Sequence, residues 1–96
     1  MVATALTMAV TGSIQGVGFR YGVCRHARVL GISGCVKNNP DGSVTIIAEA
    51  DRTRLQAFLD WCYTGVRSAR VDRIRTVWGQ PKGLYQGFNI ATDNHS

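Results

Sequence analysis

Apolar and polar residues alternate along several stretches of the chain, with the two-residue period of half-buried β-strands. The alternation is clearest in Leu6–Val10 and Val44–Ala48, and a further strand is predicted over Val71–Trp78. Within this last stretch the apolar residues Val71 and Ile74 differ in parity. The pattern therefore predicts a β-bulge or a later start of the strand.

Two other stretches carry apolar residues at helical spacing. A helix of about three turns is predicted over Phe19–Leu30, because Gly31 is a suitable residue for its C-terminal end. A second helix is predicted between Asp51, a suitable N-cap, and Gly65. The apolar stripe of this second helix consists of Leu55, Phe58, Leu59 and Cys62.

Short strands over Cys35–Asn38 and Tyr85–Ile90 complete the predicted elements. The turn-forming residues of Asn39–Gly42 predict a hairpin between Cys35–Asn38 and Val44–Ala48. The resulting order, β-α-β-β-α-β plus a short terminal strand, predicts an α+β fold. We expect the ferredoxin-like split βαβ sandwich, with two helices on one face of an antiparallel sheet. The right-handed crossover rule makes Leu6–Val10 and Val44–Ala48 central neighbours.

Length and composition predict a single domain over residues 1–96, with a frayed tail at about 91–96. No apolar run approaches the ~20 residues that span a bilayer, and the apolar N-terminus lacks the basic residues of a signal peptide. The three cysteines, Cys24, Cys35 and Cys62, are odd in number and lack C-x-x-C spacing. We therefore expect no metal site, a reducing cytoplasmic location and no membrane association.

A glycine-rich loop separates the first strand from the first helix, in the sequence Thr11-Gly12-Ser13-Ile14-Gln15-Gly16-Val17-Gly18-Phe19-Arg20. Such a loop can turn backbone N–H groups around an anion, and the following helix N-terminus adds positive potential. An arginine is unfavourable at a helix N-terminus unless an anion lies between the two. We therefore predict a phosphate site formed by Gln15, Gly16, Val17, Gly18, Phe19 and Arg20.

The chain resembles the acylphosphatase family in two blocks. They read Gly12-x-Ile14-Gln15-Gly16-Val17-x-Phe19-Arg20 and then Gly34-x-Val36-x-Asn38-x-x-Asp41-Gly42-x-Val44, and the likeness extends to Tyr85-Gln86-Gly87-Phe88. The resemblance implies a ferredoxin-like enzyme that hydrolyses acyl phosphates to a carboxylate and inorganic phosphate. It makes Arg20 the phosphate-binding catalytic residue and Asn38 the catalytic residue that orients the attacking water.

The chemistry implied by this resemblance needs no metal or cofactor, because a carboxylate leaves without being protonated. Inorganic phosphate, as product, is expected to inhibit competitively, and we expect a monomer. Two residues depart from the family. Asn39 stands where threonine or a small apolar residue is common, and it is expected to alter fine positioning. Cys35 replaces a common aromatic residue and is expected to loosen packing near Asn38.

Two other functions compete with this interpretation. Related anion-binding regulatory domains occur within hydrogenase-maturation carbamoyltransferases, but Tyr21 follows Arg20 here, where those domains tend to have proline. The net charge of +5 also suits nucleic acid. However, RNA-binding domains of this fold stack bases on aromatic residues of the central strands. Leu6–Val10 and Val44–Ala48 contain none, so no nucleic-acid partner is expected.

Overall fold

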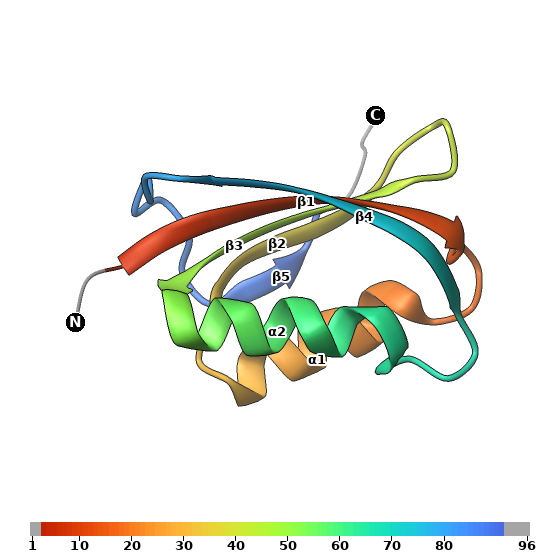
Figure 1. Ribbon diagram of the computed structural model, residues 1–96, viewed down its shortest axis with the longest axis horizontal. Helices are drawn as coiled ribbons and strands as arrows, with labels where there is room; N and C mark the ends of the chain where they lie inside the picture. The colour runs from red at the N-terminus through yellow and green to blue at the C-terminus, as the bar shows by residue number, and fades with distance from the viewer. Residues whose placement is uncertain (1–2, 92–96) are drawn as a thin grey trace.

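A single twisted sheet with both helices packed on one face forms the molecule (Figure 1). The computed structural model describes residues 3–91. These residues form β1 (Ala3–Ser13), α1 (Phe19–Val29), β2 (Ser33–Asn38), β3 (Val44–Asp51), α2 (Arg52–Thr64), β4 (Arg70–Gly79) and β5 (Phe88–Ile90). The order of elements and the layering confirm the predicted ferredoxin-like α+β fold.

The strand order across the sheet is β4-β1-β3-β2-β5. β1 and β3 are antiparallel neighbours at the centre, as the crossover rule predicts, and β2 and β3 form the predicted hairpin. The sheet differs from the expected antiparallel one at one edge, because β5 pairs in parallel with β2. The sheet is therefore mixed.

The parallel edge follows from the path of residues 80–87, which carry the chain from β4 at one edge to β5 at the other. Glu49 on β3 is buried, with only 7% of its surface exposed. Its carboxylate accepts hydrogen bonds from the backbone N–H groups of Lys82 (2.8 Å) and Gly83 (3.1 Å). This anchor holds the crossing segment at Lys82 and Gly83. The strand predicted over Tyr85–Ile90 begins only at Phe88, because Gly87 has a φ of 71° and is not extended.

The core lies between the sheet and the helices and contains the inward-facing residues of the strands. Phe58 on α2 and Phe88 on β5 meet edge to face, with ring centroids 6.0 Å apart. His26 on α1 stacks on Trp61 of α2 at 4.1 Å and joins the two helices. Burial lowers the pKa of His26, so its imidazole is a neutral packing group at pH 7.

Several local predictions are confirmed in detail. The pairing of β1 with β4 shifts register between Thr11 and Gly12, so that Asp72 is the extra residue of a bulge. Asp51 caps α2 by accepting a hydrogen bond from the backbone N–H of Arg54 at 3.2 Å, and α2 ends at Gly65. Gly31 follows α1 with a φ of 70°, the left-handed conformation that favours glycine.

The structure tests only part of the predicted frayed tail. Ala91 is tied to the sheet, because its backbone N–H donates to the carbonyl of Val36 at 2.9 Å. The rest of the predicted frayed tail, residues 92–96, lies outside the described residues. Within the described range, neither helix has the length and apolar character needed to cross a bilayer.

Candidate active site

The glycine-rich loop, residues 14–18, lies between β1 and α1 and is held at several points. Ile14 before the turn and Phe19 after it are both buried, with 2% and 1% of their surfaces exposed. The carbonyl of Val17 accepts a hydrogen bond from the hydroxyl of Ser68 at 2.6 Å. The loop is therefore fixed to the core and to the segment before β4, which pre-organises its backbone.

The two glycines of the loop have a conformational reason to be there. Gly16 and Gly18 adopt φ values of 76° and 79°, in the left-handed region. Gly18 is the N-cap of α1 and offers no side-chain cap. In the described part of the chain, the backbone N–H groups of residues 15–20 make no well-aligned hydrogen bond to a backbone acceptor. A row of free donors thus stands at the N-terminus of α1, as an anion site requires.

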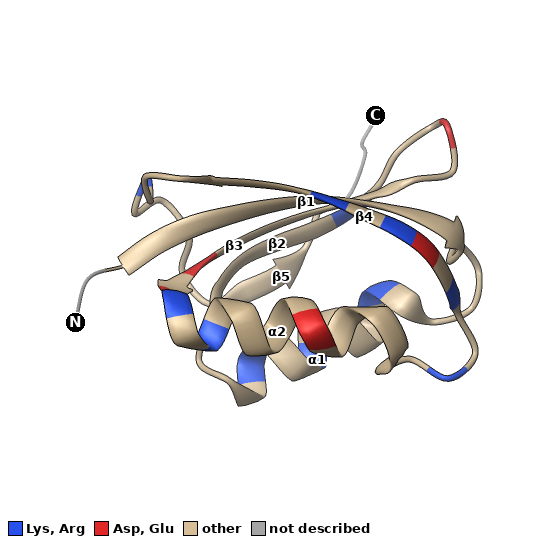
Figure 2. Cartoon of the chain, viewed as in Figure 1, with Lys and Arg blue, Asp and Glu red and all other residues tan. Residues whose placement is uncertain are grey.

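Arg20 follows this loop in the first turn of α1. Its side chain is half-buried and lines a hollow of about 230 Å³ together with Gly16, Gly18 and Tyr21. Among residues 3–91 it forms neither a salt bridge nor a side-chain hydrogen bond. Acidic residues are sparse on this chain and the first turn of α1 has none (Figure 2). An uncompensated guanidinium therefore lies beside the free amides.

Asn38 ends β2 and shares the helix-facing side of the sheet with Gly34 and Val36. Its side-chain oxygen Oδ1 is buried and accepts no hydrogen bond from any described residue. Buried polar atoms are nearly always paired, because an unpaired one costs about 1–3 kcal/mol. Oδ1 of Asn38 is thus an unpaired acceptor that solvent does not reach in this conformation.

The turn after Asn38 is rigid. The side-chain amide of Asn39 donates to the hydroxyls of Ser43 (2.9 Å) and Thr45 (2.8 Å). The carboxylate of Asp41 accepts from the backbone N–H and the hydroxyl of Ser43. These bonds lower the pKa of Asp41, so their stabilising effect is complete above the ordinary pKa of the carboxyl group and is lost as the pH falls below it.

Gln15 links the loop to this turn. Its side-chain amide donates to the carbonyl oxygens of Asn39 at 3.0 Å and Ser43 at 3.2 Å. Because Asn39 directly follows Asn38, these bonds hold the free amides and the end of β2 together. The sequence predicted only that the backbone of Gln15 faces an anion, and it gave no signal for the contribution of Ser68.

A profile of the family described as Acylphosphatase matches residues 6–90, a range that includes the loop, Arg20 and Asn38. The chain belongs to the acylphosphatase family. It is 42% identical over 83 residues to a curated acylphosphatase of Thermococcus kodakarensis, and the match covers 86% of this chain and 90% of that protein. The resemblance to this family is therefore confirmed.

Solved structures agree with this family membership. The crystal structure of an acylphosphatase from Bacillus subtilis superposes with a TM-score of 0.88 at 32% identity, covering 93% of this chain and 99% of that one. HypF of Thermococcus kodakarensis also contains a similar region, with a TM-score of 0.81 and 32% identity. The match covers 96% of this chain but only 12% of HypF.

The cysteines of this acylphosphatase-family protein lie outside the loop and the turn. Cys24 is buried, and its thiol lies 3.3 Å from the carbonyl oxygen of Phe88. Cys62 is buried in the core, and burial raises the pKa of its thiol to about 12. Cys35 is half-buried on β2. All three are free thiols, and no cluster of His, Cys, Asp or Glu among residues 3–91 has the form of a metal site.

Replacing Gly18 tests whether the loop needs glycine for its conformation. A Cβ at this position would meet no atom within 4 Å, so only the positive φ opposes a side chain. We expect Gly18→Ala to lower the free energy of unfolding by about 1 kcal/mol, and Gly18→Asn to lower it less, because asparagine tolerates the left-handed region. Urea unfolding measures both. Equal losses for the two variants would contradict this explanation.

Proposed function

We propose that this chain binds the phosphate of an acyl phosphate in the glycine-rich loop and hydrolyses it with a water oriented by Asn38. Membership of the acylphosphatase family and the fold support the hydrolysis of acyl phosphates. In the proposed complex, Arg20 and the N–H groups of Gln15, Gly16, Val17, Gly18, Phe19 and Arg20 hold the phosphate. The products are a carboxylate and inorganic phosphate.

The observation that carries the proposal is the pairing of free donors with one free acceptor. The amides of residues 15–20 and the Arg20 guanidinium offer only donors, which suits a phosphate. Oδ1 of Asn38 is an acceptor without a partner among the described residues; it is buried in this conformation, so in the proposed complex the side chain turns to meet the water. A water bound by this oxygen keeps a lone pair for phosphorus. Gln15 holds these two parts together through the carbonyl next to Asn38.

These donors and this acceptor are sufficient in principle for the hydrolysis of an acyl phosphate. Phosphoryl transfer proceeds through a loose transition state, in which orientation and stabilisation of charge on the phosphoryl oxygens matter more than a strong nucleophile. The leaving carboxylate needs no general acid. The phosphate itself can take the proton of the attacking water. Phosphate monoesters have a much poorer leaving group, so we expect them to be hydrolysed poorly.

Hydrolysis of benzoyl phosphate in the presence of EDTA tests the proposal. We expect metal-independent turnover that inorganic phosphate inhibits competitively, because phosphate binds in the same loop. The same assay with a phosphate monoester gives the matched control. Absence of turnover by a folded protein that still binds phosphate would favour the alternative, a non-catalytic anion-binding domain.

A cytoplasmic location and a monomeric state remain part of the same proposal. The proposed location rests on the cysteines, which are odd in number and lack C-x-x-C spacing. Gel filtration tests the monomeric state. A dimer at low micromolar concentration would contradict it.

Gln15→Met separates positioning from phosphate binding. Methionine keeps the length of the side chain but removes both hydrogen bonds to the turn after Asn38. We expect kcat to fall about tenfold, because the water held by Asn38 is no longer aligned with the phosphate. The inhibition constant of inorganic phosphate should stay within about twofold, since the loop amides remain. A parallel rise of that constant would show that Gln15 acts on the phosphate itself.

A further inference from the structure

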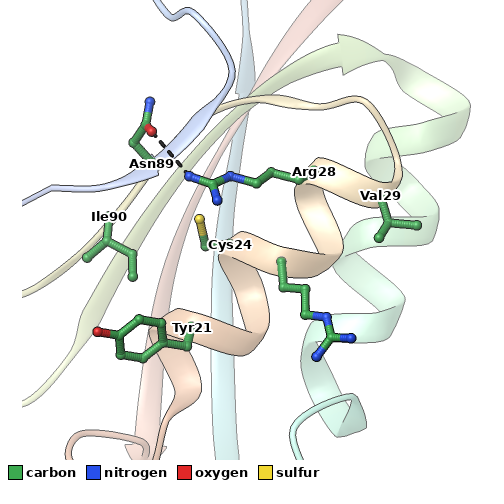
Figure 3. A pocket seen from close by; sticks show the side chains of 7 residues that line it. Tyr21, Cys24, Arg28, Val29, Asn89 and Ile90 are labelled. Carbon is green, nitrogen blue, oxygen red and sulfur yellow. Dashed lines mark hydrogen bonds between the residues drawn. The ribbon is translucent and has the colours of Figure 1, made fainter.

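A groove runs along the outer side of α1, between this helix and β5 (Figure 3). We call it the α1–β5 groove, and its volume is about 880 Å³. Tyr21 lines both this groove and the hollow that contains Arg20, so the two adjoin at this residue. The groove therefore begins one residue beyond Arg20, beside the proposed phosphate site.

The opposite wall of the groove leads to the same end of the sheet. Ile90 lines the groove and pairs in parallel with Val36 on β2. Ala91 then donates to the carbonyl of Val36. Because Asn38 follows Val36 by two residues on β2, the end of β5 lies beside the stretch that carries the proposed water-binding residue. Both walls of the groove thus adjoin the site.

The walls combine apolar surface with positive charge. Tyr21 and Val29 expose 74% and 75% of their surfaces, which is high for large apolar side chains. Arg25 and Arg28 also line the groove, and none of its lining residues is acidic. Such a groove is complementary to a molecule that has an apolar carbon skeleton and a negative charge.

The two arginines differ in availability. Arg28 is already engaged, because its Nε donates to the carbonyl of Phe88 at 2.8 Å and its Nη2 to Oδ1 of Asn89 at 3.3 Å (Figure 3). Arg25 is exposed and makes no salt bridge or side-chain hydrogen bond with the described residues. Arg25 is therefore the cation that a ligand in the groove can use.

The separation of Arg20 and Arg25 on α1 determines how long a ligand must be to contact both. Arg25 follows Arg20 by five residues, which corresponds to about 7.5 Å along the axis of α1 and about 140° around it, and Tyr21 lies between the two directions. A substrate whose phosphate is bound beside Arg20 would meet Arg25 with a group several carbon atoms away. An acyl group of only two carbon atoms would end before it.

We propose that the α1–β5 groove receives the acyl group, and that Arg25 selects acyl phosphates whose acyl group carries a second, remote carboxylate. The preferred substrates are then monophosphates of dicarboxylic acids with an apolar spacer. This inference rests on the proposed function and specifies the substrate class of the same site.

Two substrates that differ only in charge test the inference. 4-Carboxybenzoyl phosphate carries the remote carboxylate, and 4-carbamoylbenzoyl phosphate is its neutral isostere. We expect the wild-type protein to favour the first by about fivefold in kcat/KM at low ionic strength, the scale of one exposed ion pair. The preference should fall to about one in Arg25→Gln and reverse in Arg25→Glu.

Arg75→Gln is the matched control. Arg75 lies on β4 opposite Ala9, on the face of the sheet away from the helices, and its replacement removes the same charge. This variant should keep the preference of the wild-type protein. An unchanged preference in Arg25→Gln and Arg25→Glu, with benzoyl phosphate still hydrolysed, would overturn the groove proposal alone. A wild-type protein that hydrolyses none of the three substrates would overturn the proposed function and this inference with it.

Discussion

Arg20→Gln is expected to lower kcat/KM for benzoyl phosphate by about 10³-fold or more, the scale seen when a charged donor to a transferring phosphoryl group is lost. Glutamine keeps a polar side chain of moderate length but removes the charge and the planar fork of donors. The inhibition by inorganic phosphate should weaken strongly as well. Steady-state kinetics with phosphate as inhibitor measures both effects.

The fold should tolerate this change. Arg20 forms no salt bridge or side-chain hydrogen bond within residues 3–91, so its removal breaks no polar contact there. The free energy of unfolding should stay the same or rise slightly, because a cation opposes the dipole at a helix N-terminus. Arg75→Gln again controls for loss of net charge. Retention of wild-type turnover by a folded Arg20→Gln variant would remove Arg20 from the mechanism.

Asn38→Ala should produce a different pattern. We expect kcat to fall about 10²-fold while the inhibition constant of phosphate changes little, because the amide acts on the water and not on the bound phosphate. Oδ1 of Asn38 accepts no hydrogen bond from a described residue, so alanine breaks none there. The variant should therefore unfold at a similar or higher urea concentration than the wild-type protein.

The comparison of kcat with phosphate inhibition decides the role of Asn38. A weakening of phosphate inhibition by the same factor as kcat would assign Asn38 to phosphate binding. A marked loss of stability without a change in kcat would assign it to the structure of the turn. Only a selective fall in kcat supports the orientation of water.

Much of the fold follows from local patterns. The strands Leu6–Val10 and Val44–Ala48 were predicted because one face of each is buried and the other is not, and they are central neighbours in the structure. The parity conflict between Val71 and Ile74 correctly indicated the bulge at Asp72. Periodicity carries this information because it records which side of each element meets the core.

The parallel edge could not be predicted in the same way. It depends on the bonds between Glu49 and the backbone of Lys82 and Gly83, which join residues more than thirty positions apart. No periodic pattern encodes such a contact. The loop and its free amides were predicted from glycine positions, whereas the link from Gln15 to the turn required the structure.

The roles of Arg20 and Asn38 are predictions that these variants test. The free state of Arg20 and the unpaired oxygen of Asn38 are the features that make the tests decisive. In each case the variant removes a polar group that has no hydrogen-bond or ion-pair partner among the described residues.

The position of β4 at the edge of the sheet has a consequence for the behaviour of the protein at high concentration. An edge strand of ten residues is a template on which a second molecule could add its own strand. Here the strand carries exposed Arg73 and Arg75 and is bent by the bulge at Asp72 (Figure 2). We expect the exposed charges and the bend to disfavour the pairing of two such edges, and so to oppose aggregation through the sheet.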